Sequence, residues 1–228
     1  MISVLQKNFT EINAKIGEAG LIPVVKISNE EKAVPLAEAL CKGGINVIEI
    51  TFRTTDGEEG YKKIAGCIKK IASEVPEMLT GAGTVINASL AQRARNAGAR
   101  FIVSPGFNPL TIDWCINNNL PVYPGIDSPS LVEAALEKGL DVLKFFPAEV
   151  SGGVKMLNAL RGPFPQVRFI PTGGVNLLNL ESYIKCPNVI AAGGSWMVPE
   201  NLIENSDWKE IETLSRNSVG IIKNCRTA

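Results

Sequence analysis

The sequence predicts an α/β protein, a closed (β/α)₈ barrel with an extra N-terminal helix, in which residues 1–228 form a single domain. Short β-branched runs alternate with helical segments roughly every 20 to 25 residues, which is the spacing of repeated strand–helix units. Eight such runs occur, and eight alternating units can close a parallel sheet into a barrel. An open doubly wound sheet is the rival arrangement, but no complete G-x-G-x-x-G stands between a strand and a helix.

Each predicted strand is a short apolar run, and in chain order the eight are Ile22–Ile27, Asn46–Thr51, Met78–Thr84, Arg100–Ser104, Pro121–Tyr123, Asp141–Phe145, Arg168–Pro171 and Val189–Ala192. Apolar residues at helical spacing predict helices between them, at Glu30–Lys42, Glu58–Ala72, Ala88–Ala97, Ser130–Lys138 and Gly153–Leu160. Glycines directly after three of these helices, at 43–44, 98 and 139, suit helix C-termini. Ser3–Glu18 is the predicted extra helix.

The composition excludes several classes of partner. Of the 228 residues, 45% are hydrophobic and 20% are charged, with 23 basic and 23 acidic side chains and no dense basic run. We therefore expect no nucleic-acid partner and no attraction to an acidic membrane. Residues 1–7 lack the pattern of a signal peptide, and no apolar stretch is long enough to span a bilayer. The sequence predicts a cytoplasmic protein.

The chain contains no histidine and five widely spaced cysteines without a C-x-x-C pair. The missing histidine excludes Ser-His-Asp and Cys-His nucleophile pairs and H-E-x-x-H zinc sites. The cysteines suit reduced thiols rather than a disulfide framework or a zinc site. Acid–base chemistry would therefore fall to Glu, Asp, Lys, Tyr or Cys, and we expect neither a metal nor a cofactor.

One lysine lies within an apolar, aromatic run, D-V-L-K-F-F-P-A-E at residues 141–149. Burial disfavours a charged ammonium group and lowers its pKa, and a neutral amine can attack a carbonyl to form an imine. Lys144 is thus a candidate nucleophile. The alternatives are a lysine that extends out of the strand end or that pairs with Asp141 or Glu149.

A second charged side chain is expected to meet this lysine. In the strand at 46–53 the two-residue period puts Val47, Glu49, Thr51 and Arg53 on one face and apolar residues on the other. The apolar face suits the helix layer, so Glu49 and Arg53 would face the barrel axis and its rim. The same argument turns Lys144 inward, where it could meet Glu49. A purely structural ion pair is the alternative, although desolvating two charges costs several kcal/mol per ion.

Glycine-rich segments close three strands, at 80–84, 171–175 and 192–196. The last two end strands seven and eight, where such barrels often hold a phosphate on backbone N–H groups. Ser195 adds a hydroxyl donor. Taken separately, each glycine pair indicates a tight turn rather than an anion site, but their position on the last two of the eight strands favours a phosphate site.

The assembled motifs resemble the 2-keto-3-deoxy-6-phosphogluconate (KDPG) and 2-keto-4-hydroxyglutarate (KHG) aldolases over about residues 20 to 200. The motifs are E-I-T-F-R-T (49–54), G-A-G-T-V (81–85), S-P-G-F (104–107), L-K-F-F-P-A-E (143–149), G-G-V-K (152–155), P-T-G-G-V (171–175) and G-G-S-W (193–196). The resemblance implies a class I, metal-independent aldolase on a (β/α)₈ barrel, usually a homotrimer, that acts on a phosphorylated 2-keto acid and pyruvate.

The resemblance also implies a role for each motif residue. Lys144 would form the Schiff base with the C2 ketone, and Glu49 would shuttle protons. Arg53 and Thr84 would hold the pyruvyl carboxylate. The distal hydroxyls and the phosphate would be bound by Thr172, Gly173, Gly174 and Ser195, and the pyruvate pocket would be shaped by Phe146 and Pro105.

One segment departs from the family pattern. After the strand-five Pro-Gly, many relatives have a threonine and then a Ser-Glu helix start, whereas this chain has Asp127 and, in place of the glutamate, Leu131. We expect an effect on substrate preference rather than on the core chemistry.

The leading hypothesis is reversible cleavage of KDPG to pyruvate and glyceraldehyde 3-phosphate. Close variants are KHG cleavage to pyruvate and glyoxylate and cleavage of galacto-configured KDPG. Thr172 favours the gluco epimer, by resemblance. Two other classes stay open: a phosphosugar isomerase or decarboxylase barrel that needs no imine, and a catalytically idle barrel that binds a keto acid.

Overall fold

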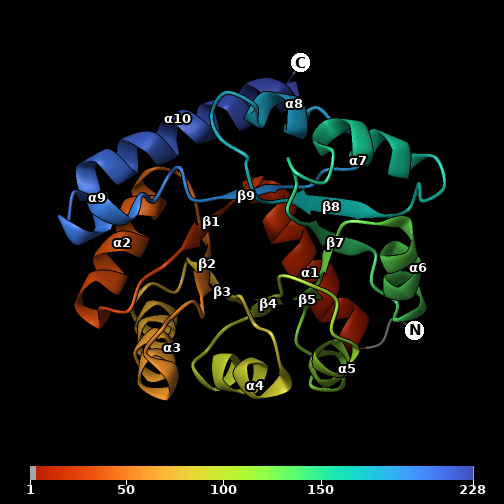
Figure 1. Ribbon diagram of the computed structural model, residues 1–228. Coiled ribbons are helices and arrows are strands. Elements are labelled where there is room, and N and C mark those ends of the chain that lie inside the picture. Colours follow the sequence, from red (N-terminus) through yellow and green to blue (C-terminus); the bar gives the residue numbers. More distant parts are fainter. Residues whose placement is uncertain (1–3, 228) are drawn as a thin grey trace.

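The computed structural model describes residues 4–227, and their side chains from 8 to 226; it is a ring of parallel strands surrounded by helices (Figure 1). The strands are β1 (Leu21–Val25), β2 (Val47–Thr51), β3 (Leu79–Gly83), β4 (Phe101–Val103), β5 (Val122–Tyr123), β6 (Gly125–Ile126), β7 (Val142–Phe145), β8 (Arg168–Pro171) and β9 (Ala192–Gly194). The helices are α1 (Val4–Ala19), α2 (Glu30–Lys42), α3 (Gly57–Glu74), α4 (Ala88–Asn96), α5 (Pro109–Asn117), α6 (Pro129–Glu137), α7 (Gly153–Arg161), α8 (Leu180–Ile184), α9 (Glu200–Glu204) and α10 (Trp208–Thr227).

The strands form a closed barrel through two irregular junctions. One sheet has the order β5-β4-β3-β2-β1-β9 and the other has the order β6-β7-β8. Pro124, which has no N–H to donate, separates β5 from β6, so the first half of this stretch pairs with β4 and the second half with β7. Two isolated parallel bridges, Phe169 to Val189 and Thr172 to Gly193, join β8 to the segment around β9. The predicted (β/α)₈ barrel is confirmed.

The boundary predicted for strand eight, Val189–Ala192, was wrong. β9 instead runs from Ala192 to Gly194. Glycine gives no apolar signal in the sequence, but its backbone still pairs with β1. A Cβ at Gly193 would overlap the Thr172 hydroxyl, so a neighbouring side chain explains why glycine stands inside this strand.

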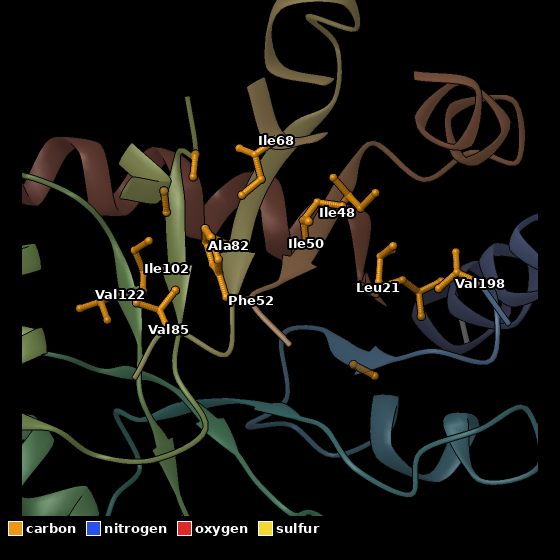
Figure 2. Packing of buried hydrophobic residues seen from close by; sticks show 14 of the residues in the cluster. Leu21, Ile48, Ile50, Phe52, Ile68, Ala82, Val85, Ile102, Val122 and Val198 are labelled. Atoms are coloured by element: carbon orange, nitrogen blue, oxygen red, sulfur yellow. The ribbon is translucent and has the colours of Figure 1, made fainter. Parts of the chain in front are cut away.

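Side chains alternate between the barrel interior and the helix layer as the two-residue period predicts. Val47 and Val142 belong to a small inner apolar cluster, whereas Ile48, Ile50 and Leu143 belong to the large outer one. Figure 2 shows Ile48 and Ile50 in this outer layer, together with Ala82 and Ile102 of the next two strands. The inward face of β2 therefore carries Glu49, as expected.

The extra N-terminal helix fills one end of the barrel. Ile12 and Ile16 of α1 are fully buried in the inner cluster, and the hydroxyl of Tyr123 on β5 donates to Asn13 Oδ1 at 2.7 Å. In Figure 1, α1 lies inside the ring of the other helices. The helix predicted from Ser3 is confirmed from Val4 onward, and Ser3 itself lies outside the described residues.

The glycines after α2, α4 and α6 have the left-handed backbone expected of helix C-termini, with φ of +90° at Gly44, +99° at Gly98 and +75° at Gly139.

Four helices, α5, α8, α9 and α10, had not been assigned from the sequence. The short ones carry little periodic signal, and α10 packs against α2 and α8 rather than between two strands. None of the helices in residues 4–227 combines the length and the apolar character needed to cross a bilayer.

Candidate active site

Lys144 and Glu49 meet inside the barrel, on strands that are 95 residues apart in the sequence. Lys144 Nζ on β7 lies 3.8 Å from Glu49 Oε1 on β2, and the two side chains are only 7% and 3% exposed. Their meeting was expected from the two-residue period and is confirmed. The separation suits an ion pair but exceeds a hydrogen bond, and Glu49 Oε1 has no hydrogen-bond partner among the described residues.

Gly83 of the G-A-G-T motif provides the space for this carboxylate. β3 pairs with β2 so that Gly81 lies opposite Glu49 and Gly83 opposite Thr51. A Cβ at Gly83 would overlap the carboxyl group of Glu49, and one at Gly81 would overlap the ring of Phe101. The role of Gly83 was missed in the sequence, where the glycine pair indicated only a turn or an anion site.

Burial raises the pKa of the Glu49 carboxyl group above its ordinary value of 4.5, and the positive charges of Lys144 and Arg53 oppose that rise. The desolvation is the larger effect, since almost no part of this side chain reaches water. Glu49 can therefore hold a proton at a higher pH than a surface glutamate.

The ring of Phe146 lies between the lysine and the turn that follows β8. Lys144 Nζ is 5.1 Å from the ring centroid, within the range of a cation–π contact. The ring edge would be 3.3 Å from a Cβ at Gly173. Phe146 thus lines the space between the nucleophile and the expected phosphate site.

Arg53 and Thr84 line a cavity of about 900 Å³ at the carboxyl ends of β1, β2 and β3. Arg53 is exposed, and Thr84 has a left-handed backbone with φ of 56°, a costly conformation for a β-branched residue. Neither Lys144 nor Glu49 lines this cavity, which extends as far as Lys26 and Glu200, an exposed ion pair at 2.9 Å. This extension was not expected from the sequence.

The residues expected at the phosphate end come together where β8 and β9 finish. Thr172 is buried and bridges to Gly193, while Gly173 and Gly174 have left-handed backbones with φ of +96° and +84°. Within residues 4–227, the N–H groups of these two glycines donate to no protein acceptor. Ser195 is exposed directly after β9.

Pro105 and the strand-five loop form another part of the rim. The carbonyl of Pro105 lies so close to β6 that a Cβ at Gly125 would overlap it, which explains the glycine there. Asp127 is exposed, and Leu131 of α6 packs partly against the outer core. The leucine at position 131 therefore contributes to packing.

The arrangement combines three chemical functions in one barrel mouth. Lys144 provides an amine, Glu49 a carboxyl group with a raised pKa, and Arg53 a planar guanidinium suited to a carboxylate. The free glycine N–H groups can receive an anion at the far side. The set suits chemistry at a carbonyl next to a carboxylate, on a substrate with a second anionic end.

Comparisons with known proteins agree with the geometry. A family model described as KDPG and KHG aldolase matches residues 12–214. A Treponema pallidum protein named 2-dehydro-3-deoxy-phosphogluconate aldolase is 46% identical over 202 residues, which cover 89% of this chain and 93% of that protein.

Two solved structures have the same fold at substantial identity. A KDPG aldolase from Legionella pneumophila, with pyruvate captured as a covalent carbinolamine intermediate, is 41% identical with a TM-score of 0.84, covering 90% of this chain and 96% of that one. The aldolase of Zymomonas mobilis ZM4 with 3-phosphoglycerate is 36% identical, also with a TM-score of 0.84, covering 92% and 95%.

Proposed function

The chain belongs to the KDPG and KHG aldolase family, and from this premise we propose that it cleaves KDPG reversibly to pyruvate and glyceraldehyde 3-phosphate through an imine on Lys144. The observation that carries the proposal is the buried Lys144–Glu49 pair. A barrel interior is more cheaply filled with aliphatic side chains, so a charged pair buried there favours chemistry over a structural role.

The first half of the reaction joins substrate and enzyme. The Lys144 ammonium passes a proton to the paired Glu49 carboxylate, and the resulting amine attacks the C2 ketone and forms a carbinolamine. Glu49 then donates a proton to the departing hydroxyl group, water leaves, and a protonated imine remains. The raised pKa of Glu49 supports this role, because it makes the carboxylate a stronger proton acceptor than a surface glutamate.

The second half breaks the carbon–carbon bond. Glu49, now ionised, accepts the proton of the C4 hydroxyl as the C3–C4 bond breaks. The electron pair of that bond moves towards the imine nitrogen and gives an enamine. The aldehyde leaves, Glu49 returns the proton to C3 of the enamine, and hydrolysis of the resulting imine releases pyruvate and the free lysine.

The remaining residues would bind the substrate. Arg53 and Thr84 would hold the pyruvyl carboxylate from the cavity side. The distal hydroxyls and the phosphate would be bound by Thr172, Gly173, Gly174 and Ser195. The pocket around the bound pyruvate would be shaped by Phe146 and Pro105.

KHG cleavage to pyruvate and glyoxylate is a second proposed activity, favoured by the family match, which covers both substrates. The chemistry at the pyruvyl end does not depend on the phosphate, so one site can serve both. Comparing kcat/KM for KDPG, for KHG and for the galacto epimer of KDPG would establish which substrate the protein prefers.

Borohydride trapping tests the imine directly. The protein is reduced in the presence of pyruvate and analysed by intact and peptide mass spectrometry. We expect a pyruvate-dependent adduct on the peptide that contains Lys144, no adduct in the Lys144→Arg variant, and loss of nearly all turnover in that variant. Activity that survives Lys144→Arg would instead support an isomerase or decarboxylase barrel that needs no imine.

We propose that residues 1–228 form one folding unit, that the protein is cytoplasmic and that it assembles as a homotrimer. Light scattering of the purified protein measures the assembly, and a single cooperative thermal transition would support one folding unit.

A further inference from the structure

The peptide groups that lead into the Gly173–Gly174 turn are held from the β7 side. The carbonyl of Thr172 accepts a hydrogen bond from the Ala148 N–H at 2.8 Å, and the carbonyl of Gly173 accepts one from the Glu149 N–H at 3.1 Å. Both donors lie in the segment that follows the strand of Lys144. Two consecutive peptide planes are therefore oriented by the chain that carries the nucleophile.

The third peptide group is held by two side-chain amides. The carbonyl of Gly174 accepts from Asn179 Nδ2 at 3.0 Å and from Asn176 Nδ2 at 3.1 Å. Asn179 also accepts the Asn176 N–H on its Oδ1 at 2.8 Å, and Asn176 accepts the Leu178 N–H on its Oδ1 at 2.9 Å. Each amide is thereby bonded at both its oxygen and its nitrogen, which orients both donors towards the same carbonyl.

These bonds determine where the free N–H groups point. In a trans peptide the carbonyl of one residue and the N–H of the next point in opposite directions. The anchored carbonyls of Thr172 and Gly173 consequently direct the N–H groups of Gly173 and Gly174 away from the β7 segment. An anion bound there would meet donors that need no reorientation.

A further contact fixes Gly174 itself. The Glu149 side chain packs so closely beneath it that a Cβ would overlap Glu149 Cγ, and the carboxylate of Glu149 accepts a hydrogen bond from the Tyr183 hydroxyl on α8. The carboxylate of Glu149 is thus engaged by a buried tyrosine.

We propose that Asn179, together with Asn176, is a positioning residue for the distal phosphate. The Gly174 carbonyl that these amides hold lies in the same peptide plane as the Val175 N–H, which, like the two glycine N–H groups, donates to no acceptor among residues 4–227. Holding this plane maintains the turn in its anion-binding shape. The inference rests on the proposed function and deepens it. Neither asparagine touches the reacting carbon. Their loss weakens recognition of a phosphorylated substrate and leaves the imine chemistry intact.

The test compares two aldehydes that differ only by a phosphate. Condensation of pyruvate with D-glyceraldehyde 3-phosphate and with D-glyceraldehyde is measured for wild type, Asn179→Ala, Asn176→Ala and the double variant. For Asn179→Ala we expect KM for the phosphorylated aldehyde to rise about five- to tenfold, the size expected for one lost hydrogen bond. The rise in KM for the phosphorylated aldehyde should be larger in the double variant than in either single variant. In all three variants, kcat/KM for D-glyceraldehyde should change by less than about twofold.

The matched control is Asn96→Ala, which removes an exposed asparagine at the end of α4. This variant should change neither KM for D-glyceraldehyde 3-phosphate nor kcat/KM for D-glyceraldehyde. Equal losses with both aldehydes would overturn the inference, since they would indicate general disorder of the site. An unchanged KM for glyceraldehyde 3-phosphate in the double variant would overturn it too. If Asn179→Ala does not fold, Asn176→Ala carries the test, because it removes the other donor to the same carbonyl.

Failure of the proposed function is separable from failure of the inference. A wild-type protein that forms no borohydride-trapped adduct with pyruvate contradicts the aldolase proposal alone. In that case, calorimetric titration with inorganic phosphate tests the positioning role of Asn179. Weaker phosphate binding to Asn179→Ala than to wild type supports the inference. Equal binding to the two proteins, or no binding to wild type, overturns it.

Discussion

Gly83 on β3 leaves the space that the Glu49 carboxyl group on β2 occupies. Together with the lysine on the opposite side of the barrel, this vacancy determines where the carboxyl group lies relative to the nucleophile. The glycine is therefore as much a part of the site as the charged residues, although it has no functional group.

The first prediction concerns this vacancy. Gly83→Ala should displace Glu49 and lower kcat by about 10²-fold, within the range that a positioned general acid–base contributes. Gly17→Ala is the matched control, since nothing lies within 4 Å of a Cβ there. Steady-state kinetics on KDPG and the circular dichroism spectra of both variants provide the measurement. A folded Gly83→Ala enzyme with wild-type kcat would contradict the assigned role of the vacancy.

The second prediction concerns pH. Because burial raises the pKa of Glu49, the acidic limb of the kcat/KM profile should lie above 4.5, the ordinary value for glutamate. The sign follows from the role as a base: as the pH falls through the raised pKa, Glu49 takes up a proton and activity is lost. Glu49→Gln should lower kcat by about 10²-fold or more and remove this limb. An acidic limb at or below 4.5 in wild type would refute the raised pKa.

The third prediction concerns the guanidinium at the cavity. Arg53→Lys keeps the charge but loses the planar pair of donors, so the apparent affinity for pyruvate in borohydride trapping should weaken about tenfold. Arg161→Lys, at the exposed end of α7, serves as the control. Trapping at a series of pyruvate concentrations gives the half-saturating concentration for each variant. The same half-saturating concentration in both variants would contradict the role of Arg53 in binding the carboxylate.

The fourth prediction concerns the helix that fills the barrel end. Ile16 of α1 is fully buried in the inner cluster, so Ile16→Ala should reduce the free energy of unfolding by about 2–5 kcal/mol. Ile86→Val, at a residue 51% exposed, should change it by less than about 0.5 kcal/mol. Urea unfolding measures both. A change of kcat in folded Ile16→Ala would show that α1 affects the site as well as stability.

The alternation of strands and helices, and the face on which Glu49 and Lys144 lie, could be predicted from the sequence. Both depend on local periodicity, because successive side chains of a strand point to opposite faces wherever the strand is placed. The end of β9 could not be predicted, since the glycines at 193 and 194 give no apolar signal although their backbone continues the strand.

The sequence by itself determined which functional groups are available: one lysine in an apolar strand, a glutamate and an arginine on the same face of another strand, glycine pairs at the last strands, and no histidine. The tertiary structure decided the distances. The 3.8 Å between Lys144 Nζ and Glu49 Oε1, the room beside Gly83 and the backbone bonds from Ala148 and Glu149 to the Gly173–Gly174 turn all arise between segments far apart in the chain. Local residue patterns cannot encode such separations, because the closure of the barrel brings these segments together.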